Sequence, residues 1–140
     1  MMAMSYGYVY VAQVAMGADK NQLVKALVEA EKYHGPSLII AYAPCTSHGL
    51  KCGMHDVQGE MKRAVESGYW ALYRYDPCKE RPMTLDSKAP TMDYLEFVAG
   101  ENRYASLTKT FPEEAERLFE RGKEDALRRF DRYRRMTQDN

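Results

Sequence analysis

The residues with the widest chemical repertoire lie in one short segment, residues 44–55, whose sequence is PCTSHGLKCGMH. This segment contains two of the three cysteines and two of the three histidines of the 140-residue chain. Thiolates and imidazoles bind metal ions, and a cysteine activated by a histidine can act as a nucleophile. Any chemistry of this protein is therefore expected first in this segment.

Two interpretations use the segment by itself. Cys45, His48, Cys52 and His55 have the number and type of ligands that suit zinc. Their C-x2-H-x3-C-x2-H spacing, however, lacks the long separation between ligand pairs of zinc modules. Alternatively, Cys45 is a nucleophile with His48 or His55 as its base, which also requires a third group to orient the histidine.

Two further interpretations concern Cys45 alone. It can be one ligand of a metal site whose other ligands lie elsewhere, or a small buried side chain at the end of a strand. Free cysteine is among the most often buried residue types, so the pattern alone favours the buried side chain.

The elements before this segment determine where it lies. Residues 8–14 are rich in β-branched and aromatic side chains and predict a strand, and residues 19–33 predict an amphipathic helix. Asp19 and Gln22 have the spacing of a capping box at its start. The apolar run 37–43 is typical of a central parallel strand that is covered on both faces. Because ligands collect at the carboxyl ends of such strands, we expect residues 44–55 at this edge of the sheet.

The rest of the chain completes an α/β prediction. Residues 56–67 predict a second helix that Gly68 ends, and residues 69–75 predict a third strand. This order predicts a mostly parallel sheet of about three strands with flanking helices. Two prolines and a charge cluster in 76–82 indicate a connector, so we divide the chain into residues 1–76 and a helical C-terminal extension, 77–140.

Within that extension, Pro112 marks the start of a long helix with an apolar stripe and with arginines in its last turns. At the other end, Gly7 precedes a strand in the position of a helix C-cap glycine. Three strands are also few for an open sheet. These two features favour part of a larger domain over a small domain with a frayed N-terminus.

Composition narrows the class of protein. The chain has 20 Lys and Arg against 20 Asp and Glu, and this zero net charge argues against a nucleic-acid-binding or polybasic membrane-surface protein. It has no apolar run of the ~18 residues that a membrane span needs. Three cysteines without an export signal fit a reducing compartment. We therefore expect a soluble, cytoplasmic protein.

Several strings together resemble the C-terminal part of pyruvate:ferredoxin (flavodoxin) oxidoreductases. They are YGYVYVAQVAMGAD (6–19), GPSLIIAYAPC (35–45) followed by HG (48–49), KRAVESGYW (62–70), LDSKAP (85–90), RYASL (103–107) and FPEEA (111–115). The resemblance covers nearly the whole chain, which makes it more specific than any single motif.

This resemblance implies a function. The family oxidises pyruvate with coenzyme A to acetyl-CoA and CO2 and passes the electrons through three 4Fe–4S clusters to ferredoxin or flavodoxin. It uses thiamine diphosphate with Mg2+, and its members are typically homodimers. The resemblance implies that residues 1–76 are the end of the thiamine-diphosphate-binding domain. It also implies that Cys45 is the fourth ligand of the cluster nearest the thiamine, the other three coming from upstream.

The chain also departs from the family. It lacks the Gly-Asp-Gly segment and the downstream Asn that hold the diphosphate and Mg2+, so no catalytic or thiamine-binding residue is assigned. We expect it to be inactive alone and to work with the rest of the oxidoreductase polypeptide. Cys52 and Cys78 are expected to be incidental thiols, and His48 and His55 exposed loop residues. The alternative is a non-catalytic α/β binding module with its own metal site in the 45–55 loop.

Overall fold

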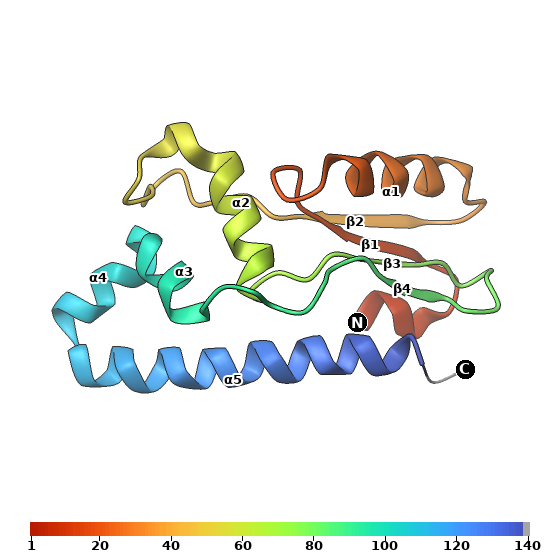
Figure 1. The fold of residues 1–140 in the computed structure, drawn as a ribbon. Coiled ribbons are helices and arrows are strands. Elements are labelled where there is room, and N and C mark those ends of the chain that lie inside the picture. The colour runs from red at the N-terminus through yellow and green to blue at the C-terminus, as the bar shows by residue number, and fades with distance from the viewer. Residues whose placement is uncertain (139–140) are drawn as a thin grey trace.

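The computed structural model describes residues 1–138, and the last two residues of the predicted extension, 139–140, lie outside this described part. Within residues 1–138, four strands form one mixed sheet in the order β2-β1-β3-β4 (Figure 1). The strands are β1 (Tyr10–Val14), β2 (Ser37–Ala41), β3 (Tyr73–Tyr75) and β4 (Met83–Leu85). The expectation of a mixed α/β chain is therefore confirmed.

The strand directions differ from the prediction. Only β1 and β2 are parallel, while β3 runs antiparallel to β1 and β4 antiparallel to β3. The prediction of a mostly parallel sheet is thus wrong. The reason is the position of helix α2 (Val57–Glu66), which lies beyond the carboxyl ends of β1 and β2 instead of returning along the sheet (Figure 1). The chain re-enters the sheet from that end, so β3 must run opposite to β1.

The strand expected at the centre lies at the edge. Strand β2 borders β1 on one side only, and its residues are exposed or half-buried. The central position belongs to β1, all five residues of which are buried. The prediction that residues 37–43 form a central strand covered on both faces is therefore wrong for the part of the chain that the structure describes.

Helix α1 (Lys20–Lys32) follows β1 and packs on the parallel pair. As predicted, the side chain of Asp19 accepts a hydrogen bond from the backbone N–H of Gln22, at 2.9 Å. The reciprocal half of a capping box is not formed. Instead, the side-chain amide of Gln22 donates to the carbonyl oxygen of Gln13 and to Oδ2 of Asp86. The cap thus joins the helix to the sheet.

The predicted connector forms a turn within the sheet. The backbone N–H of Asp76 donates to the carbonyl oxygen of Pro82, and β4 follows directly. The sheet therefore continues past residue 76, while the division into 1–76 and 77–140 stays a prediction. The predicted strand at 69–75 is shorter than expected, and Gly68, with φ +75°, follows the end of α2 as predicted.

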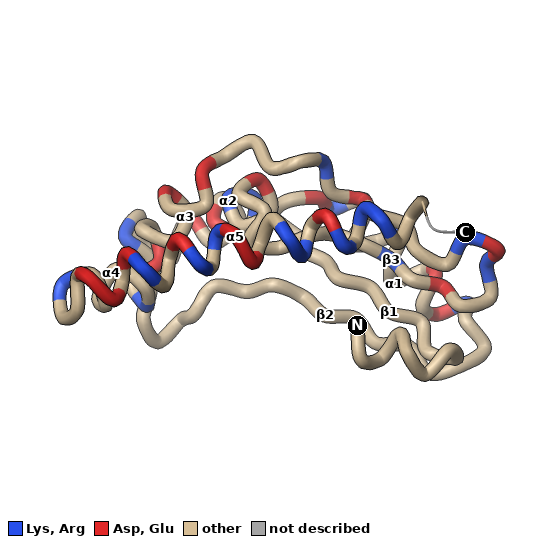
Figure 2. Tube along the Cα trace, turned by 90° about the horizontal axis from the view of Figure 1, so that it is seen from below, with Lys and Arg blue, Asp and Glu red and all other residues tan. Residues whose placement is uncertain are grey.

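The remaining helices are η1 (Met2–Tyr6), η2 (Met54–Asp56), α3 (Tyr94–Gly100), α4 (Asn102–Thr110) and α5 (Pro112–Met136). The C-cap predicted at Gly7 is confirmed, with φ +74°, and α5 begins at Pro112 as predicted. Figure 1 shows α5 running along one side of the whole molecule, and Figure 2 shows charges of both signs along it.

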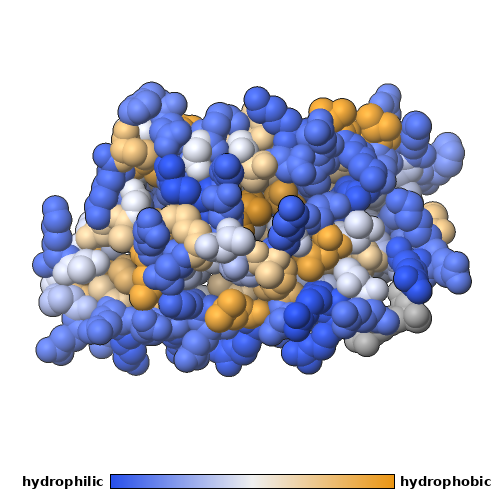
Figure 3. Space-filling model, in the orientation of Figure 1, coloured by the Kyte–Doolittle hydropathy of each residue, from blue (hydrophilic) through white to orange (hydrophobic). Residues whose placement is uncertain are grey.

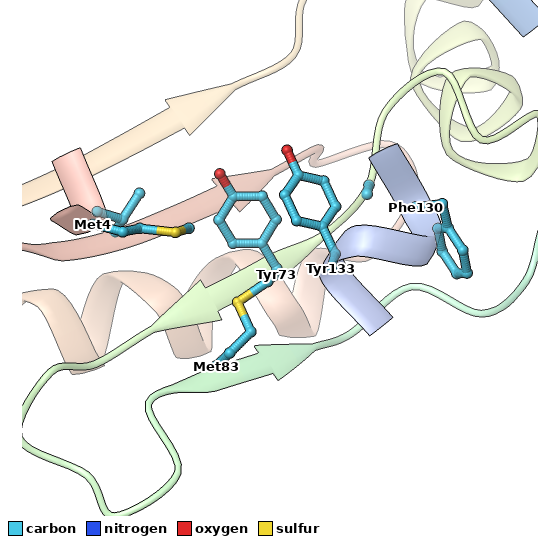
Figure 4. Packing of buried hydrophobic residues seen from close by; sticks show 7 residues of the cluster. Met4, Tyr73, Met83, Phe130 and Tyr133 are labelled. Carbon is cyan, nitrogen blue, oxygen red and sulfur yellow. The ribbon is translucent and has the colours of Figure 1, made fainter. Parts of the chain in front are cut away.

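Helix α5 closes the face of the sheet opposite α1. Its Phe130 and Tyr133 pack with Met4, Tyr73 and Met83 in one buried cluster (Figure 4). The rings of Tyr73 and Tyr133 lie 4.8 Å apart between centroids. Part of the predicted apolar stripe thus packs on the chain itself, whereas Leu118 and Leu127 of the predicted stripe are exposed. None of the helices within residues 1–138 combines the length and the apolar character needed to span a membrane.

Candidate functional site

The loop that contains Cys45 leaves the sheet at the carboxyl end of β2, as expected. The backbone N–H of Tyr42 still donates to the carbonyl oxygen of Val14, so the parallel pairing extends to the start of the loop. Pro44 is buried and Cys45 is half-buried. The loop lies at the end of the molecule where α2, α3 and α4 also lie (Figure 1).

Contacts with the junction of α3 and α4 fix the loop. Leu50 forms an antiparallel bridge with Glu101, and the backbone N–H of Lys51 donates to the carbonyl oxygen of Gly100. The side-chain amide of Asn102 donates to the carbonyl oxygen of His48, at 3.0 Å. Residues 48–51 are therefore held by helices that follow them by about fifty positions in the sequence.

Cys45 and His48 form a close pair at the start of this loop. A turn in which the backbone N–H of Gly49 donates to the carbonyl oxygen of Cys45 brings Sγ of Cys45 to 3.0 Å from Nδ1 of His48. The hydrogen bond between the two side chains lowers the pKa of the Cys45 thiol from 9.0 to about 7, and backbone N–H groups of His48 and Ser47 add to this effect. A substantial fraction of Cys45 is therefore thiolate at neutral pH, the form that binds metals.

The other candidate ligands do not join this pair. The exposed thiol of Cys52 lies 3.5 Å from a guanidinium nitrogen of Arg63, and Cys78 is exposed in the turn between β3 and β4. Within residues 1–138, no three His, Cys, Asp or Glu side chains are arranged to hold a metal ion. The interpretation of Cys45, His48, Cys52 and His55 as one self-contained metal site is therefore wrong for this structure.

Within residues 1–138, the structure provides the cysteine–histidine pair that a nucleophilic Cys45 requires, but not the third group. Cys45 has His48, and not His55, as its neighbour. Among the residues that the structure describes, the ring of His48 has no hydrogen bond to a side chain other than Cys45. The third group that orients the base in such enzymes is therefore not provided by this part of the chain.

Two buried glutamates under the loop were not predicted from the sequence. Glu101, 3% exposed, accepts a 2.7 Å hydrogen bond from the hydroxyl group of Tyr42. Glu60, 2% exposed, is paired through Oε2 with Arg63, and its Oε1 has no hydrogen-bond partner within residues 1–138. Burial raises the pKa of Glu101, and the nearby charge of Glu60 raises it further against the hydrogen bond from Tyr42. No sequence pattern separates these glutamates from those on exposed helix faces.

Comparison with known proteins identifies relatives over almost the entire chain. The chain is 59% identical to the pyruvate-flavodoxin oxidoreductase of Klebsiella pneumoniae and 57% identical to that of Enterobacter agglomerans, in each case over 98% of the chain. It is 56% identical to the pyruvate:ferredoxin oxidoreductase of Moorella thermoacetica over 99% of the chain. No protein-family model matches the chain.

The matches cover only a small part of each relative. The chain spans only 12% of the length of each of these three relatives. Identity this high over 98% or more of the chain confirms the resemblance drawn from its sequence motifs. Over nearly its whole length, the chain therefore matches one segment of the pyruvate:ferredoxin (flavodoxin) oxidoreductases.

Proposed function

We propose that this chain is the part of a thiamine-diphosphate-dependent pyruvate oxidoreductase that supplies Cys45 as one ligand of a 4Fe–4S cluster. The observation that supports this most directly is the position of Cys45. Cys45 lies in the loop that follows the carboxyl end of β2, beside the parallel strand β1. The chain that contains it matches these oxidoreductases over nearly its whole length.

This chain can supply one ligand of such a cluster, Cys45, and not more. The Cys45 thiol is half-buried, and His48 lowers its pKa to about 7, which favours the thiolate that binds iron. Cys52 and Cys78 are exposed and take part in other contacts. The three remaining ligands would come from the rest of the polypeptide, which accounts for most of the length of the relatives.

The reaction proposed for the whole enzyme is oxidation of pyruvate with coenzyme A to acetyl-CoA and CO2, with electrons passed to ferredoxin or flavodoxin. When bound, a 4Fe–4S cluster carries one electron at a time between the substrate site and the acceptor. Thiamine diphosphate and Mg2+ would be held by the rest of the polypeptide. We further propose a cytoplasmic, homodimeric enzyme, and no catalysis by the 140-residue chain alone.

Within this proposal the chain's own residues position a sulfur atom. Cys45 holds the cluster, and the 3.0 Å contact from His48 orients the sulfur and stabilises its charge. The bridge between Leu50 and Glu101 and the hydrogen bond from Asn102 keep the loop in place. The role of the helical part 94–136 is then to brace the loop that presents the ligand.

The test is a serine substitution at Cys45 in the full-length oxidoreductase. Cys45→Ser should remove the iron and the electron paramagnetic resonance signal of one cluster and abolish pyruvate-dependent reduction of the acceptor. Cys52→Ser, seven residues away in the same loop, is the matched control and should keep both. Unchanged iron in a folded Cys45→Ser protein would contradict the proposal, as would pyruvate-dependent reduction of ferredoxin by the 140-residue chain alone.

A further inference from the structure

The free side of strand β2 is an unprotected hydrogen-bonding edge. The backbone N–H of Tyr10 donates to the carbonyl oxygen of Pro36, and that of Tyr42 to the carbonyl oxygen of Val14. In a parallel ladder with this register, Leu38 and Ile40 bond to β1. The N–H and C=O groups of the alternate residues Ser37, Ile39 and Ala41 therefore point away from β1. No strand within residues 1–138 pairs with that side.

This edge has none of the features that normally prevent further pairing. Exposed edges in natural proteins are blocked by lysines, prolines, bulges or inward-pointing charges. The five residues of β2, SLIIA, contain no charge and no proline, and their pairing with β1 is regular. Figure 2 shows β2 and the chain that follows it without a charged residue. The edge is thus suited to accept another strand.

Both faces of β2 are apolar as well. Ile39 packs toward α1 with the cluster around Tyr10 and Ala12. Leu38, opposite Val11 in the register, lies on the other face and is 42% exposed. A strand that is apolar on both faces is typical of the interior of a layered sheet rather than of its border.

An exposed apolar stripe continues this surface on α1. Ala26 is fully buried against the sheet, but Val24, Leu27 and Val28 are 58%, 50% and 42% exposed. Their i, i+3, i+4 spacing places them together on the outer side of the helix. Figure 3 shows hydrophobic side chains over the region of α1, at the upper right. We define the β2 border as the side chains of Val24, Leu27, Val28 and Leu38 together with the free backbone groups of Ser37, Ile39 and Ala41.

The opposite border of the sheet, formed by β4, is covered by a helix. Helix α5 packs against β4, and Met83 of β4 is 5% exposed. The large apolar side chains exposed on α5 itself, Leu118 and Leu127, are nine positions apart and have charged neighbours in the sequence. Within residues 1–138, only the β2 border combines unpaired backbone groups with exposed apolar side chains on both layers.

We infer that the β2 border is an interface with the rest of the oxidoreductase polypeptide, which adds a strand to β2 and packs an apolar helix on Val24, Leu27 and Val28. This inference rests on the proposed function. It is supported by the length of the relatives, of which this chain is 12%, so that a large polypeptide is available as occupant. A second copy of the chain, pairing edge to edge, is the competing occupant.

Geometry favours the polypeptide over the second copy. A strand added next to β2 has one of its ends beside the carboxyl end of β2, where Cys45 begins its loop. The same occupant would therefore bring its own residues to the edge of the sheet at which the remaining cluster ligands are needed. Two identical chains pairing through β2 would bring only a second set of the same side chains.

Residue-resolved hydrogen exchange on the full-length oxidoreductase tests the inference. The amides of Leu38 and Ile40, bonded to β1, are the internal reference for protection within the same strand. Ile39 and Ala41 should exchange as slowly as these references. Exchange more than about tenfold faster at Ile39 and Ala41 than at the references would overturn the inference, because their amides would then lack a partner.

Substitutions on α1 give a second, independent measurement. In the full-length protein, Val24→Lys with Val28→Lys should accelerate exchange at Ile39 and Ala41 by at least about tenfold and lower the unfolding temperature. Leu118→Lys, an equally exposed apolar position on α5, is the control and should change neither. No effect of the α1 pair would count against the interface.

Dilution separates the two occupants. If protection of Ile39 is lost in step with dissociation of an oligomer, the occupant is a second copy and the inference is wrong. Protection that is independent of protein concentration supports a partner within the same polypeptide. None of these readouts involves iron or turnover, so failure of the interface and failure of Cys45 as a cluster ligand are observed separately.

Discussion

The hydroxyl group of Tyr42 donates a 2.7 Å hydrogen bond to Oε1 of Glu101, a residue that follows it by 59 positions. Tyr42 stands just after β2, and Glu101 lies between α3 and α4. The same Glu101 forms the bridge with Leu50. Through these two contacts Glu101 connects the start and the middle of the Cys45 loop to the helices that brace it.

Removing the Tyr42 hydroxyl group should destabilise the fold. Tyr42→Phe leaves the buried carboxyl group of Glu101 without its donor, which typically costs about 1–3 kcal/mol. Chemical denaturation measures the loss. Tyr8→Phe, at an exposed tyrosine, is the control. Combining Tyr42→Phe with Glu101→Leu should recover part of the loss, because neither buried partner is then unsatisfied; a double variant less stable than Tyr42→Phe would contradict this account.

The raised pKa of Glu101 predicts a pH dependence of stability. Because of burial, the Glu101 carboxyl group binds its proton more tightly in the folded protein than in the unfolded chain. Protonated Glu101 therefore contributes its full stabilisation to the folded state below the ordinary pKa of 4.5. It is lost as the pH rises from there through the folded pKa. Glu101→Gln, which carries no titrating group, should remove this part of the pH profile. Denaturation series from pH 4 upward for both proteins would reveal it, and superimposable profiles would exclude it.

Arg74 should be the most costly single charge to remove. Its side chain is 7% exposed and bonds to both carboxylate oxygens of Asp86 and to Glu29. Arg74→Met leaves these carboxylates without their guanidinium partner, and breaking a buried pair typically costs about 3–5 kcal/mol. Arg128→Met removes an exposed partner of Asp125 on α5 and should change stability by less than about 1 kcal/mol. Equal losses in the two variants would show that Arg74 is not specially placed.

His48 should control the reactivity of Cys45. With the thiol pKa lowered to about 7, alkylation of Cys45 in the metal-free chain should reach half of its maximal rate near that pH. His48→Ala removes the main cause, so the midpoint should move up toward the ordinary value of 9.0. Iodoacetamide labelling followed by peptide mass spectrometry measures it, with Cys78 in the same sample as the reference. A midpoint unaffected by His48→Ala would assign the shift to another group.

His48 should also tune the proposed cluster in the full-length enzyme. A hydrogen bond to a ligating sulfur stabilises the reduced, more negative cluster, so its loss should lower the reduction potential. For His48→Ala we expect a decrease on the order of tens of millivolts, since a tenfold change in a one-electron equilibrium corresponds to about 59 mV. Spectroscopic redox titration checks this. His55→Ala, in the same loop, should leave the potential unchanged.

The sequence by itself determined the features that depend on neighbouring residues. The Asp19 cap, the start of α5 at Pro112 and the positive φ angles of Gly7 and Gly68 each follow from the chemistry of a few consecutive positions. The position of Cys45 at the end of a strand could be predicted for the same reason. The family relationship also followed from strings within the sequence, and the comparisons confirmed it.

Only the tertiary structure decided the direction of β3, the edge position of β2 and the burial of Glu60 and Glu101. Each depends on contacts between residues far apart in the sequence. Strand β3 runs antiparallel because α2 stays beyond the end of the sheet, which no local pattern encodes. A glutamate on an exposed helix and one under the Cys45 loop are the same residue type, and only the packing of α3 and α4 against that loop distinguishes them.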